Sequence, residues 1–238
     1  KPASGGSGGL RRSKALGSSV EFSDFREYVH GDDLRRVYWN AFARFDRLFL
    51  KLFMEEQEQR VHLILDASAS MGFGEPNKWD CAVKLAEALC YMALCGSDSV
   101  TLFALTDGGE RHTRPLRGRH GYPEATAFLA GLEPRGLSSL SKAAPLLPLS
   151  AGRGMSVLLT DLLWEDGYER GVQSLLYRRQ ELAVLQLWSR EEWEPSLSEA
   201  VELRDSETGQ RLALNAGYDL LRRYREAARG YAEQAAAY

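Results

Sequence analysis

This sequence contains few cysteines and histidines, and its net charge is small. Its 238 residues include three cysteines and four histidines, and the formal net charge is −3. An odd number of cysteines does not make a disulfide framework, and no cysteine or histidine pair has the spacing of zinc ligands. The weak net charge offers no general electrostatic basis for binding nucleic acid, so no nucleic-acid partner is expected.

Long hydrophobic runs and nucleotide-binding motifs are also missing. No apolar run approaches the length of a membrane span, and no signal peptide is visible. Neither a phosphate-binding P-loop nor a G-x-G-x-x-G motif occurs. Cys81, Cys90 and Cys95 fall within one helical pattern, where we expect small buried thiols of a reduced, cytoplasmic protein.

What the sequence does contain is a buried strand that ends in acid and hydroxyl groups. Residues 61–72 read VHLILDASASMG, and the apolar run at its start predicts a strand. Asp66, Ser68 and Ser70 follow in a tight turn, at the end of the strand where ligands bind in open α/β sheets. Their oxygens suit Mg²⁺, with Mn²⁺ or Ca²⁺ as alternatives, although serine and aspartate also serve simply as helix caps.

Strand and helix patterns alternate through the segment 61–238. This order favours an α/β fold: a doubly wound, mostly parallel sheet with helices on both faces. We interpret 106–119 as a polar loop, and 140–149 as a helical segment interrupted by Pro145 and Pro148. Further strands are expected over 99–105, 155–159 and 182–188, and helices over 78–95, 122–132 and 166–180.

The two ends of the chain differ from this alternating pattern. Residues 1–18 are expected to be a flexible basic lead-in, and 19–60 an N-terminal extension that arginine–carboxylate pairs hold onto the main domain. At the other end we expect a hairpin over about 200–214 and a helix over about 218–238. This helix ends abruptly, so we expect the natural chain to continue beyond it.

Two other loops can supply oxygen ligands beside Asp66. The loop 136–139 carries the adjacent hydroxyls of Ser138 and Ser139, and Asp161 follows the strand at 155–159. Asp107 is a rival because it also ends a strand. We favour Asp161, since its strand is expected to be more central in the sheet.

The sequence D-A-S-A-S at 66–70 resembles the metal-ion-dependent adhesion site of von Willebrand factor type A domains. That site combines D-x-S-x-S with a threonine from a second loop and an aspartate from a third. Serine stands at the threonine position here, and T-D-L replaces the common T-D-G. The metal ligands that the resemblance implies are Asp66, Ser68, Ser70, Ser138 (with Ser139 as the alternative) and Asp161.

Two longer stretches are similar to a bacterial family known as domain of unknown function fifty-eight (DUF58). They are EFSDFREYVHGDDLRRVYWNAFAR at 21–44 and VELRDSETGQRLAL at 201–214. Members of that family often accompany MoxR-type AAA+ ATPases. The resemblance therefore implies a cytoplasmic adaptor or chaperone-like factor that works with such an ATPase.

The expected chemistry is binding and not catalysis. An ion held by one or two carboxylates and three hydroxyls keeps an open position, where a partner's Asp or Glu can replace water. We expect a non-enzymatic protein–protein interaction module, with the aromatic residues Phe73 and Trp164 as candidate partner contacts. The alternatives are a structural module with a degenerate site, or a Mg²⁺-dependent phosphoryl-transfer or hydrolytic enzyme, whose usual D-x-D pattern is interrupted by Ser68.

Overall fold

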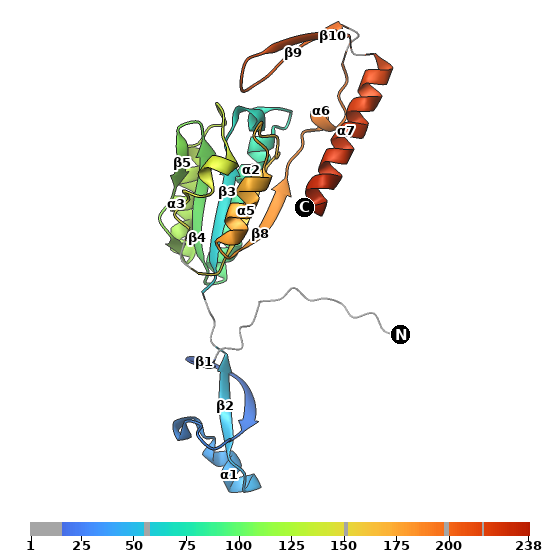
Figure 1. Cartoon of the computed structure of the whole chain (residues 1–238). Helices are drawn as coiled ribbons and strands as arrows, with labels where there is room; N and C mark the ends of the chain where they lie inside the picture. Colours follow the sequence, from blue (N-terminus) through green and yellow to red (C-terminus); the bar gives the residue numbers. More distant parts are fainter. Residues whose placement is uncertain (1–15, 55–57, 150–151, 198–199, 216) are drawn as a thin grey trace. The chain divides into compact units, whose positions relative to one another are not determined.

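The chain divides into two compact units, Lys1–Glu58 and Gln59–Tyr238. The computed structural model describes residues 16–54, 58–149, 152–197, 200–215 and 217–238 (Figure 1). Most of the predicted lead-in, residues 1–15, lies outside the described residues. The packing of the extension 19–60 onto the main domain stays a prediction.

The first unit is a two-stranded antiparallel sheet with short helices in its connection. Asp33 caps the first helical turn by accepting a hydrogen bond from the Arg35 backbone, as expected for an acid that follows the turn at Gly31. Arg26 and Asp32 form a salt bridge within this unit, which does not test the predicted pairs to the main domain. Its elements are β1 (Leu16–Glu27), η1 (Leu34–Arg36), α1 (Trp39–Phe45) and β2 (Phe49–Met54).

The second unit contains the predicted doubly wound sheet. Its strand order is β5-β4-β3-β7-β8, and β4, β3, β7 and β8 are parallel. The elements of the sheet and its connections are β3 (Arg60–Asp66), η2 (Ala69–Gly72), α2 (Lys78–Cys95), β4 (Ser99–Thr106), β5 (Gly109–His112), β6 (Leu116–Arg117), η3 (Arg119–Gly121), α3 (Tyr122–Ala130), α4 (Leu140–Ala143), β7 (Gly154–Thr160), α5 (Glu169–Tyr177) and β8 (Gln180–Gln186). The elements after the sheet are α6 (Arg190–Trp193), β9 (Ala200–Arg204), β10 (Arg211–Asn215) and α7 (Tyr218–Ala237).

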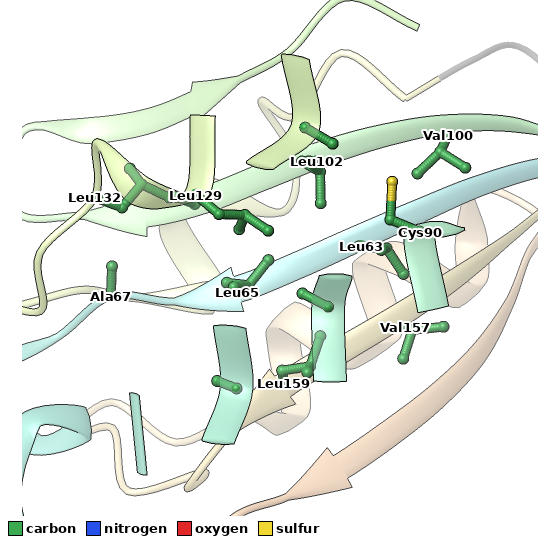
Figure 2. Packing of buried hydrophobic residues seen from close by; sticks show 14 of the residues in the cluster. Leu63, Leu65, Ala67, Cys90, Val100, Leu102, Leu129, Leu132, Val157 and Leu159 are labelled. Carbon is green, nitrogen blue, oxygen red and sulfur yellow. The ribbon is translucent and has the colours of Figure 1, made fainter. Parts of the chain in front are cut away.

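Both faces of the sheet are covered by helices. The side chains of a strand alternate between the two faces, so one strand contributes to both cores. Leu63 and Leu65 of β3 pack into a core with α2 and α3, where Cys90 and Leu129 are buried (Figure 2). Ile64, between them in sequence, belongs to the opposite core with α4 and α5. Residues 63–65 of the central strand are therefore a continuous apolar run, which is typical of a strand buried on both faces.

The prediction of a polar loop over 106–119 is partly wrong. It contains β5 and β6, which both pair antiparallel with β4. Gly109, with a φ of +104°, lets the chain reverse directly after β4. The sequence of β5, GERH, has no apolar alternation, so its pairing could not be predicted from periodicity.

Two smaller expectations also need correction. The helix predicted over 166–180 is shorter, because Arg179 adopts a positive φ of 60° and Gln180 already begins β8. Of the three cysteines only Cys90 is buried, and burial raises its pKa to about 11. Cys81 and Cys95 are exposed, since they lie on the side of α2 that faces away from the sheet.

The C-terminal elements follow the prediction. β9 and β10 form an antiparallel hairpin, and α7 is a twenty-residue helix that contributes Tyr231 and Ala235 to the edge of the second core. Over the described part of the chain, no helix combines the length and the apolar character needed to cross a bilayer.

Candidate metal centre

Asp66 is the centre of the predicted site. It ends β3, between β4 and β7, and its side chain is fully buried. Its Oδ1 accepts hydrogen bonds from the Ser68 backbone nitrogen at 3.0 Å and from Ser138 Oγ at 2.8 Å, and its Oδ2 accepts one from Thr160 Oγ1 at 2.8 Å. Burial, with the negative charge of Asp161, raises the pKa of Asp66 despite these hydrogen bonds.

The two motif serines lie together in the turn after β3. The Oγ atoms of Ser68 and Ser70 are 3.0 Å apart, within hydrogen-bond distance of each other. The turn is tied to the second loop, because the Ala69 backbone nitrogen donates to the Gly136 carbonyl oxygen at 2.9 Å. The motif and the loop carrying Ser138 are therefore held as one surface.

The second loop brings Ser138 to Asp66 and directs Ser139 elsewhere. Ser138 Oγ donates to Asp66 and accepts a hydrogen bond from Trp164 Nε1 at 2.8 Å. Ser139 instead caps α4 by accepting from the Lys142 backbone, and its hydroxyl donates to Asp166. Of the two alternatives left open by the sequence, Ser138 is the one beside the motif.

The third loop brings Asp161 close to the motif, together with a lysine that the sequence analysis did not assign. Asp161 is buried; its Oδ1 accepts a hydrogen bond from the Leu163 backbone nitrogen, and its Oδ2 accepts one from Lys78 Nζ at 2.8 Å. Lys78, with a side chain only 1% exposed, also pairs with Glu192. Lysine is normally solvent-exposed, so its position at the start of α2 gave no signal of this role.

The position of Glu192 at a helix start was easier to predict from the sequence than the role of Lys78. Its side chain accepts from the Ser189 backbone while Ser189 Oγ accepts from the Glu192 backbone, which is a capping box at the start of α6. The pattern S-x-x-E predicts such a helix start. It does not predict that the same carboxylate also binds Lys78.

The prediction that Trp164 is an exposed partner contact needs correction. Trp164 is only 6% exposed, because its ring belongs to the second core and its indole nitrogen is hydrogen-bonded to Ser138. Phe73 is 49% exposed, directly after the serine turn. Its contact with a partner stays a prediction.

The rival residue Asp107 lies on a neighbouring loop. It is exposed and packs against Gly136, where an added Cβ would lie 2.4 Å from Asp107 Oδ2. β4 and β7 both lie directly beside β3, so the position of the strand in the sheet does not distinguish Asp107 from Asp161. The hydrogen bonds of Asp66 to Ser138 and Thr160 instead mark the two loops that converge on the motif.

The donor chemistry of these residues fits a hard divalent cation. Asp66 and Asp161 offer carboxylate oxygens, and the three serines offer hydroxyl oxygens, which are ligands that Mg²⁺, Mn²⁺ and Ca²⁺ accept. Ser138 Oγ donates one hydrogen bond and accepts one, which leaves it a lone pair. Within the described ranges, no three or more His, Cys, Asp or Glu side chains are grouped to hold a metal, so a cation here depends on the serines.

One more acid reaches this region from the end of the chain. Glu207, at the tip of the β9–β10 hairpin, directs its carboxyl group at the hydroxyls of Ser70 and Ser68. Burial raises the pKa of Glu207; the hydroxyls oppose this effect, and the charges of Asp66 and Asp161 add to it. The hairpin was predicted from the sequence, whereas the position of its tip was not.

Comparison with known proteins decides the family. The sequence model of the family "Protein of unknown function DUF58" matches residues 24–236. The chain belongs to this family. The fold of this DUF58 chain is α/β, with a mostly parallel sheet between two layers of helices.

Relatives in mycobacteria share a part of their length with this DUF58 chain. Uncharacterized protein Rv1480 of Mycobacterium tuberculosis and Uncharacterized protein Mb1516 of Mycobacterium bovis are each 26% identical to it over 205 residues. The match covers 81% of this chain and 62% of each relative. The chain thus spans less than two thirds of the length of these curated relatives.

Several solved structures are similar at low identity. An aerotolerance-related membrane protein from Bacteroides fragilis is 18% identical with a TM-score of 0.45, covering 72% of this chain and 88% of that one. BatB, a conserved hypothetical protein from Bacteroides thetaiotaomicron, is 16% identical with a TM-score of 0.43, covering 72% and 87%. The VWA domain of SpRpn10 is 10% identical with a TM-score of 0.35, covering 55% and 89%.

Proposed function

We propose that this protein binds partners through a divalent cation, most simply Mg²⁺, at the end of β3. Asp66, Ser68, Ser70, Ser138 and Asp161 would hold the ion. When bound, the ion supplies a positive charge with an incompletely filled coordination shell. An Asp or Glu carboxylate of a partner protein would replace a water ligand in that shell, and no covalent bond would be made or broken.

The observation that carries this proposal is the environment of Asp66. Its carboxylate is fully buried, and each of its three hydrogen-bond donors is neutral. Burying a carboxylate is costly unless a positive charge accompanies it. Lys78 supplies its charge to Asp161 and Glu192, whose two negative charges already exceed it. A cation beside Asp66 would remove the remaining cost.

We further propose that the partner is a MoxR-type AAA+ ATPase, and that this protein acts in the cytoplasm as a non-enzymatic adaptor or chaperone-like factor. The support for this partner is the family to which the chain belongs. Phe73 offers an exposed aromatic surface directly beside the serine turn. Aromatic residues are common at the centres of protein interfaces. The site needs no general base for this role.

The test is a binding measurement between the immobilised chain and a MoxR-type ATPase from the same organism. We expect binding in Mg²⁺ that is lost in excess chelator and in Asp66→Ala. Asp107→Ala, an acid-to-alanine change on an adjacent exposed loop, should bind like the parent. Binding that is equally strong in chelator would contradict a metal-bridged interface.

A further inference from the structure

The tip of the β9–β10 hairpin is built to present Glu207. The Asp205 side chain accepts hydrogen bonds from the backbone nitrogens of Glu207 at 2.8 Å and Thr208 at 2.6 Å. Gly209 closes the turn with a positive φ of 72°, and its nitrogen donates to the Asp205 carbonyl oxygen. These bonds fix the backbone of the tip and do not involve the Glu207 carboxyl group.

Glu207 is also the one tip residue that is shielded from solvent. Its neighbours Ser206 and Thr208 are exposed, whereas Glu207 is half-buried. Most of the residues in both hairpin strands are exposed. In Figure 1 the hairpin lies beyond the carboxyl end of the parallel strands, on the side where β3 ends. The covering of Glu207 therefore comes from its approach to the serine turn, and not from packing of the hairpin into a core.

The surroundings of Glu207 are unfavourable for a carboxylate without a cation. The charges of Asp66 and Asp161 act on it, and Lys78 is already paired with Asp161 and Glu192. Like charges gathered in a poorly solvated place repel one another. The hydroxyls of Ser70 and Ser68, which it faces, are themselves candidate metal ligands. A divalent cation among these groups would turn the repulsion into coordination.

We propose that Glu207 is an internal ligand of the metal ion, so that the hairpin tip holds the position a partner's carboxylate would otherwise take. This inference rests on the proposed metal-dependent function and adds its regulation. A partner would have to displace the hairpin to bind. A lone two-stranded hairpin is only marginally stable in water, so displacing its tip should cost little free energy.

The test compares Glu207→Ala with Glu202→Ala in the whole chain, using Mn²⁺ as the probe. Glu202 lies in the same hairpin, exposed and paired with Arg211, away from the tip. We measure Mn²⁺ affinity and the water-proton relaxation enhancement per bound ion. Glu207→Ala should weaken Mn²⁺ binding by about 10-fold or more and raise the enhancement, because water fills the vacated position. Glu202→Ala should match the parent in both.

Hydrogen exchange of the hairpin amides gives a second reading. Mn²⁺ should slow exchange in the parent and in Glu202→Ala, and leave it unchanged in Glu207→Ala. Equal affinity and enhancement in the parent and Glu207→Ala would overturn the inference while the metal site stands. Binding by Glu207→Ala alone would show that the hairpin excludes the ion, which also overturns it. Absence of Mn²⁺ binding in both would end the proposed function as well.

Discussion

At the scale of single residues, the candidate centre is held by hydrogen bonds that cross from loop to loop. Ser138 illustrates this, since one hydroxyl joins Asp66 of the first loop to the indole of Trp164 in the third. Such a chain of donors fixes where each oxygen points. The side chains therefore hold one another in place, which would limit the entropic cost of binding an ion.

Lys78 gives a prediction about stability. Replacing it by methionine should lower the free energy of unfolding by about 3–5 kcal/mol, because Asp161 and Glu192 lose their shared cation in a buried place. Arg114→Ala removes an exposed ion pair with Glu124 and should leave the free energy of unfolding almost unchanged. Urea unfolding at neutral pH with chelator present measures both. Equal losses in the two variants would contradict the role of Lys78.

His62 gives a prediction about pH. It is buried in β3 with its Nδ1 3.0 Å from Gln180 Oε1, and burial is the main cause that lowers its pKa. The positive charges of Arg178 and Arg60 act in the same direction. The unfolded chain then binds more protons than the folded one, once pH falls below the ordinary histidine pKa of about 6.5. Stability that is present above this pH is therefore lost as pH decreases.

The variant His62→Leu isolates this effect. Gln180 Oε1 keeps a donor in the variant, because Ser156 Oγ also donates to it. The stability of the parent relative to His62→Leu should fall as pH is lowered from about 7.5 to 5. Urea unfolding at several pH values measures this difference. A difference that does not change with pH would show that His62 keeps its ordinary pKa in the fold.

At the scale of elements, the close contact between α4 and α5 depends on a glycine. A Cβ on Gly171 would lie 2.4 Å from Leu140 Cγ and 2.9 Å from the Leu140 backbone carbon. Gly171→Ala should therefore destabilise the protein by about 1–3 kcal/mol, since the two helices must separate.

Gly230 provides the matched control for that substitution. It lies within α7, and an added Cβ would have no atom within 4 Å beyond its own helix and neighbours. Gly230→Ala should stabilise by about 0.5–1 kcal/mol through helix propensity. Thermal unfolding of both variants checks the pair. A stabilising Gly171→Ala would mean that α4 and α5 are not packed as described.

The length and apolar character of each element explain which of them could be predicted from the sequence. β3, β4 and β7 are apolar runs buried on both faces, and each was predicted within about two residues. β5 and β6 are short, and β5 is polar, so they were predicted as loop. Their pairing comes from the turn at Gly109 and from the open edge of β4, which periodicity does not report.

The candidate site was predictable only in its local part. Asp66, Ser68 and Ser70 belong to one five-residue motif, and Ser138 was recognised as one of two adjacent hydroxyls. Lys78 and Glu207 were not assigned, because their roles arise from positions that distant segments take in the fold. A lysine at a helix start and a glutamate in a hairpin turn both look like ordinary surface residues.

At the scale of the whole molecule, the sheet brings acids and hydroxyls from three loops to one end. The C-terminal hairpin adds a further acid at that same end. The N-terminal unit, Lys1–Glu58, is a separate compact body with its own ion pairs. The match covers 62% of each mycobacterial relative, so this chain corresponds to only a part of those proteins.

The most direct test of a metal centre is a calorimetric titration of the purified chain with Mg²⁺ and Mn²⁺. We predict saturable binding of about one ion per chain, lost in Asp66→Ala and retained in Asp107→Ala. Circular dichroism should first establish that each variant is folded. Saturable binding that persists in folded Asp66→Ala, or no binding by the parent with either ion, would contradict a cation site at the end of β3.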